Sequence, residues 1–192
     1  MEPGQSYHIY NHANGTENIF LKEGNYLFFL KQYPKYLGDV VDTYAYCLMP
    51  NHFHFLVGVK EEFELRKTFP KFQTLEKLVS KQFSNFFSAY TQSFNKAYQR
   101  RGSLFMKNFK RSPILNEHQW QETFLYIHLN PVKHGFTEKP ENWKWSSWHA
   151  YENQGKTSKL NRIYYLNFFD NWTQVKELTE TKKQFINTQN LE

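Results

Sequence analysis

Two histidines separated by one residue, His52 and His54, are the side chains of this sequence best suited to bind a metal ion. They open the segment His52–Val59, which follows a tight turn at 49–51 and is predicted to be the second strand of a β-hairpin. Alternate side chains of a strand share a face, so both imidazoles should point the same way, about 7 Å apart. Two imidazoles at that separation can converge on one ion. The alternative is a pair of solvated histidines on an exposed sheet face.

Tyr126 is the candidate nucleophile, and it lies in a segment predicted to be a helix over 117–130 that Pro131 ends. Stepping about 100° per residue places Tyr126 and Asn130 in one polar sector, opposite most of the apolar residues. The two side chains are one turn apart and therefore neighbours. A helix packed over the sheet would bring a phenol and an amide oxygen to the histidine pair. The alternative is a tyrosine at a helix–sheet boundary, with its ring packed and its hydroxyl in water.

Basic residues are concentrated just before this helix, and no acidic residue occurs between Lys96 and Ile114. The formal charge of the chain is +6, which favours a polyanionic partner. Cations in such a run can neutralise the phosphates of nucleic acid. The residues that we expect to contact DNA are Arg100, Arg101, Lys107, Lys110 and Arg111, together with Lys133. The alternative is a solvated basic loop.

The elements that must position these side chains follow one another in the order β-α-β-β-α-β-α. The predicted strands are 7–11, 40–48, 52–59 and an extended stretch in 104–115, and the predicted helices are 18–36, 74–98 and 117–130. This order predicts an α+β fold, with a ferredoxin-like antiparallel sheet, helices packed on one face, and Tyr126 on a C-terminal helix. Residues 1–154 should form one domain. Residues 155–192 are more polar and are predicted to be a helical or mobile extension.

Composition limits the possible classes of protein further. The 192 residues are enough for one well-packed domain. Cys47 is the only cysteine, which excludes an internal disulfide and a multi-cysteine zinc site. No signal-peptide pattern opens the sequence and no apolar stretch approaches the length of a membrane span. We therefore expect a cytoplasmic protein with no membrane partner.

Four segments of the sequence together resemble the single-tyrosine transposases of the His-hydrophobe-His class, and most closely the REP-associated tyrosine transposases. They contain MPNHFH, RGSLF, YIHLNPVKHG and WSSW, in the family's order, over residues 7–151. By this resemblance His52 and His54 are the metal-binding pair, and Tyr126 is the nucleophile. Asn130 is then the third metal ligand, at a position where insertion-sequence relatives carry glutamine.

The resemblance also implies an activity. It is a metal-dependent endonuclease and strand transferase that acts on single-stranded DNA at hairpins through a 5′-phosphotyrosine intermediate. The family uses Mg²⁺ or Mn²⁺, and two imidazole ligands suit Mn²⁺ better. The expected partner is single-stranded or hairpin DNA, and the expected oligomeric state is a monomer or a homodimer.

Two other functions remain open at this point. The first is a non-catalytic nucleic-acid-binding module of ferredoxin-like fold, since RNA-recognition domains also present a four-stranded sheet with aromatic and basic residues. The second is a metal-dependent hydrolase that uses water, in which Tyr126 only orients the substrate. A covalent protein–DNA adduct would distinguish the transposase-like enzyme from both.

Overall fold

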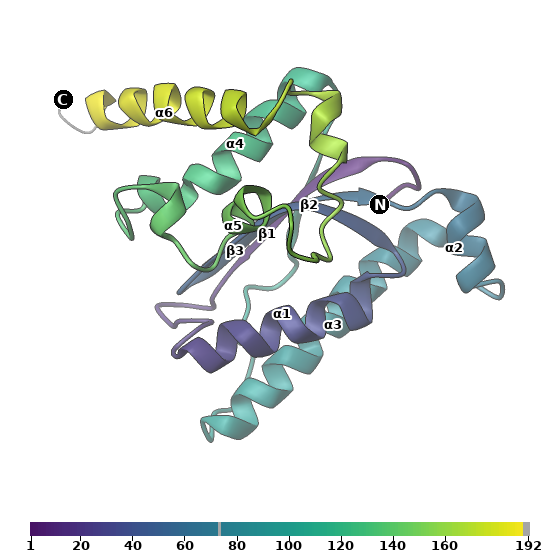
Figure 1. The fold of residues 1–192 in the computed structure, drawn as a ribbon. Coiled ribbons are helices and arrows are strands. Elements are labelled where there is room, and N and C mark those ends of the chain that lie inside the picture. The colour runs from purple at the N-terminus through teal and green to yellow at the C-terminus, as the bar shows by residue number, and fades with distance from the viewer. Residues whose placement is uncertain (73, 190–192) are drawn as a thin grey trace.

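A four-stranded antiparallel sheet forms the centre of the structure, a computed structural model that describes residues 1–72 and 74–189 (Figure 1). The strands are β1 (Ser6–His12), β2 (Val41–Met49), β3 (His52–Val59) and β4 (Lys110–Pro113), in the sheet order β2-β3-β1-β4. The predicted α+β class with an antiparallel sheet is confirmed, and β3 has the predicted bounds. Strands β3 and β1 are central, whereas β2 and the short β4 form the two edges.

Six α-helices connect and cover the strands. They are α1 (Glu23–Leu37), α2 (Glu62–Thr68), α3 (Leu75–Ala97), α4 (Glu117–Lys133), α5 (Trp148–Glu152) and α6 (Trp172–Gln189), with 3₁₀ turns at Pro140–Asn142 and Tyr164–Asn167. The predicted β-α-β-β-α-β-α order is present, with α2 inserted before α3. The sequence pattern gave no sign of α2.

The prediction that α4 ends before Pro131 is wrong. The helix continues through this proline to Lys133. Proline has no N–H, so the only intrahelical hydrogen bond lost is the one to the carbonyl of Ile127. The next turn still closes, because the amide of His134 donates to the carbonyl of Asn130 at 3.1 Å. A proline this close to the end of a helix therefore costs too little to stop it.

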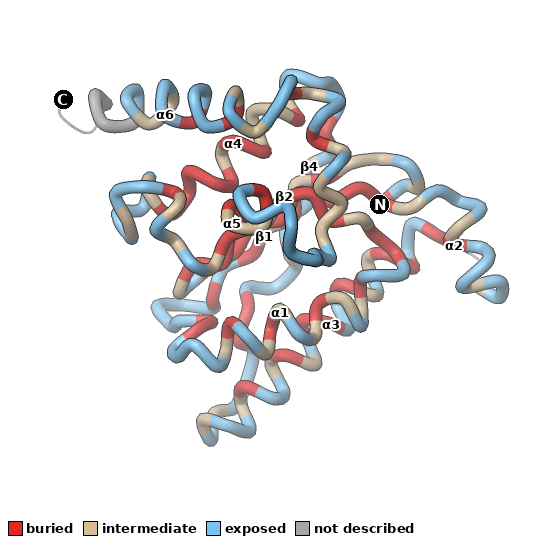
Figure 2. The backbone as a smooth tube through the Cα atoms, in the orientation of Figure 1, coloured by how far each residue is buried: buried red, intermediate tan, exposed pale blue. Residues whose placement is uncertain are grey.

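Helices cover both faces of the sheet, so the predicted packing on one face is wrong. In Figure 1, α1 and α3 lie below the strands, whereas α4 and α6 lie above them. The lower core contains Phe53 and Phe55 of β3, and the upper core contains Leu56 of β3 and Cys47 of β2. Every residue of β3 is buried, as the red strands at the centre of Figure 2 illustrate. A strand that is buried on both faces needs cover on both.

The residues after 155 contribute to the upper core. Tyr165, Phe169 and Val175 are buried in the same cluster as Phe124 of α4. Helix α6 lies along the outside of α4, at the top of Figure 1. Among the residues that the structure describes, no helix combines the length and the apolar character that a membrane span requires.

Candidate active site

Histidines from three elements gather on the upper face of the sheet. They are His8 and His12 of β1, His52 and His54 of β3, and His134 just after α4. Strand register sets His12 opposite His52, and their rings stack with centroids 4.7 Å apart. The rings of His52 and His54 meet edge to face at 5.3 Å. The sequence predicted only His52 and His54, although the alternation His8–Tyr10–His12 already indicated a second polar strand face.

Both histidines of β3 have their Nδ1 atoms engaged. Nδ1 of His52 lies 2.7 Å from Oδ1 of Asn51, and Nδ1 of His54 lies 2.9 Å from Nε2 of His8. An amide oxygen only accepts, so His52 donates from Nδ1 and keeps the lone pair of Nε2 free. Ligand-binding histidines commonly hold their second nitrogen in this way, because the contact fixes both tautomer and ring orientation.

Asn130 faces the free nitrogen of His52. Its Oδ1 lies 3.3 Å from Nε2 of His52, its side chain is fully buried, and its Nδ2 has no hydrogen-bond partner in the part of the chain that the structure describes. Two acceptors in contact are satisfied by a proton on one of them, by a turn of the amide that brings its N–H to the ring nitrogen, or by a cation bound to both. The contact is therefore compatible with a metal between the two side chains.

Tyr126 lies beside the second histidine. Its ring centroid is 5.5 Å from that of His54 and 5.9 Å from that of His8, and both contacts are edge to face. The ring is half-buried, and Nζ of Lys133 lies 5.4 Å above it. The structure thus brings His52, His54, Tyr126 and Asn130 to one place.

Burial keeps these imidazoles neutral. It lowers the pKa of His52 and of His8 to about 4, and the pKa of His54 falls well below its usual value. Desolvation is the main cause in each case, because a charged ring loses its hydration inside the pocket. Neutral imidazoles have the lone pairs that a metal ion needs.

The pocket above the histidines has a volume of about 650 Å³. Its lining also includes Tyr10, Ser112, Glu122 and Thr123. Within the described ranges, no set of three or more histidine, cysteine or carboxylate side chains is arranged to hold a metal. The amide oxygen of Asn130 is a further protein oxygen in contact with one of the two imidazoles, that of His52.

The predicted DNA contacts lie in different parts of the structure. Lys133 lines the histidine pocket, whereas Lys107, Lys110 and Arg111 line a second groove, described below. Arg101 is exposed on the loop after α3.

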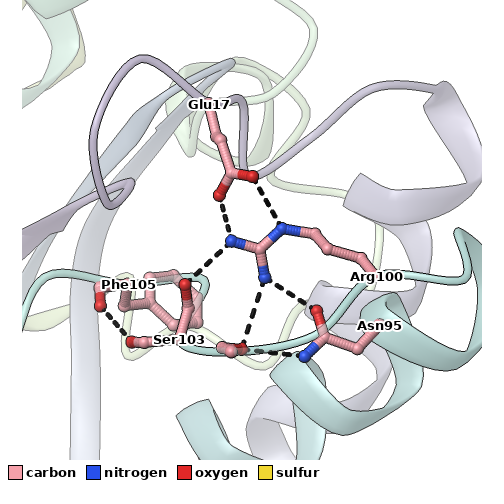
Figure 3. Close-up of polar contacts among 6 residues, drawn as sticks. Glu17, Asn95, Arg100, Ser103 and Phe105 are labelled. Atoms are coloured by element: carbon pink, nitrogen blue, oxygen red, sulfur yellow. Dashed lines mark hydrogen bonds and ion pairs between the residues drawn. The ribbon is translucent and has the colours of Figure 1, made fainter.

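Arg100 is engaged within the protein. Its guanidinium pairs with the carboxylate of Glu17, donates to Oδ1 of Asn95 at 2.8 Å, and donates to the carbonyl of Ser103 at 2.8 Å (Figure 3). These contacts occupy the donors that a phosphate would need. Arg100 is therefore a structural residue of this loop, and not one of the free cations expected from the sequence.

The fold and the site together define an α+β protein with a histidine pair on a central strand and a tyrosine on the helix that covers it. This is the arrangement that the resemblance to single-tyrosine transposases implied.

Comparisons with known proteins agree with that class. No family model matches the chain. The chain is 28% identical over 113 residues to a Haemophilus influenzae protein named "Putative REP-associated tyrosine transposase", and the match covers 56% of this chain and 59% of that protein. The fold is similar to a solved structure of a REP-associated tyrosine transposase bound to a REP hairpin. That match has a TM-score of 0.60 and 18% identity, over 82% of this chain and 85% of the other. The family resemblance predicted from the sequence is confirmed: the chain is similar in sequence to one REP-associated tyrosine transposase and in fold to another.

Proposed function

We propose that this protein cuts and rejoins single-stranded DNA at hairpins through a covalent bond between Tyr126 and a 5′ phosphate. The observation that carries the proposal is the position of the Tyr126 ring, 5.5 Å from the ring of His54 and on the helix that also carries Asn130. The Tyr126 phenol and the two neutral imidazoles thus line one open pocket, and the buried amide oxygen of Asn130 lies against His52.

The pocket fits a divalent metal ion. His52 and His54 would bind it through Nε2 and Asn130 through Oδ1, and the facing acceptors of His52 and Asn130 at 3.3 Å support this set. Two imidazoles favour Mn²⁺ over Mg²⁺ on ligand chemistry. A bound ion would polarise the phosphoryl oxygens and offset the negative charge that develops during the reaction.

The remaining steps belong to the side chains. The hydroxyl oxygen of Tyr126 attacks the phosphorus and gives up its proton, and the bond from phosphorus to the 3′ oxygen breaks. The 3′ oxygen takes a proton and leaves as a hydroxyl. The energy of the phosphodiester is conserved in the tyrosine ester, so a 3′ hydroxyl of another strand can reverse the reaction without ATP. The ammonium of Lys133, 5.4 Å from the Tyr126 ring, adds positive charge where the phosphate would bind.

The test compares Tyr126→Phe with wild type on a labelled DNA hairpin with single-stranded flanks, in the presence of Mn²⁺. Wild type should give a DNA-shifted protein band on a denaturing gel, and Tyr126→Phe should lose it while still binding the DNA. Tyr10→Phe is the matched control, because Tyr10 is a second phenol of the same pocket. It should retain the adduct.

The outcomes separate the competing functions. Cleavage that leaves a free 5′ phosphate without any protein adduct would identify a hydrolase that uses water. Binding without cleavage by wild type would indicate a nucleic-acid-binding module. An adduct that persists in Tyr126→Phe but disappears in Tyr10→Phe would assign the nucleophile to Tyr10.

A further inference from the structure

A second and larger groove lies on the opposite side of the sheet from the histidines. It has a volume of about 830 Å³ and runs between α3 and the segment that leads into β4. One wall consists of short polar side chains of α3, which are Ser80, Ser84, Ser88, Thr91 and Gln92. The other wall carries Lys107, Lys110 and Arg111, and none of the lining residues is acidic.

The polar wall results from the way α3 packs, with its apolar face toward the lower core and its polar face outward. Phe83, Phe86 and Phe87 point into the lower core and leave Ser84 and Ser88 exposed on the outside of the helix. Short uncharged side chains let a ligand approach the helix closely, and they add no negative charge. This wall is therefore suited to lie along a phosphate backbone.

The cations of the other wall are uncompensated. In the described part of the chain, Lys107, Lys110 and Arg111 form no ion pair, in contrast to Arg100 with its carboxylate partner. The guanidinium of Arg111 lies 5.6 Å from the ring of Phe109, which holds it at the groove. Unpaired cations beside a hydroxyl-lined wall are complementary to a polyanion.

Strands β1 and β4 separate this groove from the histidine pocket. Register sets Ser112 opposite His8 on the pocket side, whereas Arg111 lies opposite Ile9, which is buried in the lower core. Ser112 lines the pocket and Arg111 lines the groove. Strand β4 is a four-residue edge strand, so a chain of phosphates can pass around its free edge from one site to the other.

We infer that this groove binds the flank of the DNA strand whose scissile phosphate lies in the histidine pocket. The inference rests on the proposed function and adds to it a specific path for the substrate. Its sequence-independent contacts would supply affinity, while the pocket performs the chemistry.

The experiment adds negative charge to the α3 wall and measures DNA affinity. Ser84→Glu/Ser88→Glu should weaken binding of a fluorescein-labelled hairpin with long single-stranded flanks by about tenfold or more, since each lost phosphate contact removes salt-dependent affinity. A control for negative charge on α3 is Ser93→Glu, which adds one charge where the groove variant adds two, at an exposed serine that faces a different pocket. Circular dichroism and Mn²⁺ binding should be unchanged in both variants.

A second experiment repeats the binding measurement with hairpins whose single-stranded flanks are shortened. Once the flank no longer reaches the groove, wild type and Ser84→Glu/Ser88→Glu should bind the hairpin equally. Equal affinity of Ser84→Glu/Ser88→Glu and Ser93→Glu for the long-flanked hairpin would overturn the inference, and so would a defect that does not depend on flank length. These affinity measurements do not depend on the covalent adduct. If the groove variant weakens DNA binding but wild type forms no adduct, the groove inference is supported and the role of Tyr126 as nucleophile is wrong.

Discussion

The difference between a solvated histidine pair and a metal site lies in what holds the second nitrogen of each ring. On β3 both second nitrogens are held, that of His52 by Asn51 and that of His54 by His8. A free imidazole divides its proton between two positions, and only one of these tautomers leaves Nε2 ready to bind. The Asn51 contact therefore prepares the ring of His52 for a ligand, whereas the His8 contact holds the ring of His54 in place without selecting its tautomer.

Asn51→Ala tests this arrangement. The substitution removes the acceptor at Nδ1 of His52, and Asn51 is exposed, so the fold should be unaffected. We expect Mn²⁺ affinity to fall by about tenfold, the lower end of the range for such supporting contacts. Isothermal titration calorimetry would measure it, and Asn14→Ala, at another exposed asparagine, is the control. Unchanged Mn²⁺ affinity in Asn51→Ala would show that the contact has no orienting role.

At the scale of elements, the loop from α3 to β4 is held by one side chain. Gln99 and Gly102 have positive φ values of 51° and 87°, so the chain turns sharply after the helix. Arg100 holds that turn by bonding Glu17, Asn95 and the backbone of Ser103. The groove-lining segment that follows begins from this anchored turn.

Arg100→Lys keeps the charge and removes the planar set of donors. Because the side chain is largely buried and donates to Asn95 and to the carbonyl of Ser103, we expect the free energy of unfolding to fall by about 1 kcal/mol. Urea unfolding followed by tryptophan fluorescence measures this difference. The exposed neighbour provides the control, since Arg101→Lys should leave stability unchanged. A loss in both variants would mean that the network in Figure 3 does not hold the turn.

The same elements show what the sequence could predict. The bounds of β3 and the long helix α3 follow from local periodicity, which acts over a few residues and is visible in the sequence. The prediction missed that helices cover the upper face as well as the lower one. This depends on where α4 packs, and the local sequence pattern does not encode that position. Helix α2 has only seven residues, too few for a helical period to stand out.

The site was predictable to the same extent. Strand alternation places His52 and His54 on one face, and helical spacing places Tyr126 and Asn130 on one face. The sequence could therefore predict that the two members of each pair are adjacent. His12 and His134 come beside His52 only through strand pairing and helix packing. The order in which strands pair is a non-local property, and no spacing along the chain reveals it.

At the scale of the molecule, the two edges of the sheet differ. The edge at β2 is covered, because the amide of Leu48 donates to the carbonyl of Trp145 and the amide of Ser147 donates to that of Tyr46. Among the residues that the structure describes, the edge at β4 has no such backbone hydrogen bonds, and it carries Lys110, Arg111 and Pro113 in four residues. Charges and proline discourage pairing with another strand, and here they also line the DNA path that we infer.

Stability should depend on pH through the buried histidines. Burial lowers the pKa of His128 to about 3, in contact with Ser147 at 2.7 Å, and that of His8 and His52 to about 4. In the unfolded chain these rings take up protons near pH 6.5, so the unfolded state binds more protons between pH 6.5 and those lower values. The contribution of these neutral rings to the free energy of unfolding is therefore fully present above pH 6.5. It falls as the pH decreases through that window.

His128→Gln isolates the contribution of one ring, because glutamine keeps a hydrogen-bonding group near Ser147 but cannot take up the proton. Each such ring contributes a slope of at most about 1.4 kcal/mol per pH unit, so the variant should lose stability less steeply than wild type between about pH 6 and pH 5. Urea unfolding at a series of pH values measures the slopes. His118→Gln, at a histidine whose side chain is 84% exposed, should keep the wild-type slope. Parallel slopes for His128→Gln and wild type would show that the buried ring is already protonated in the folded protein or that the core around it opens before the chain unfolds.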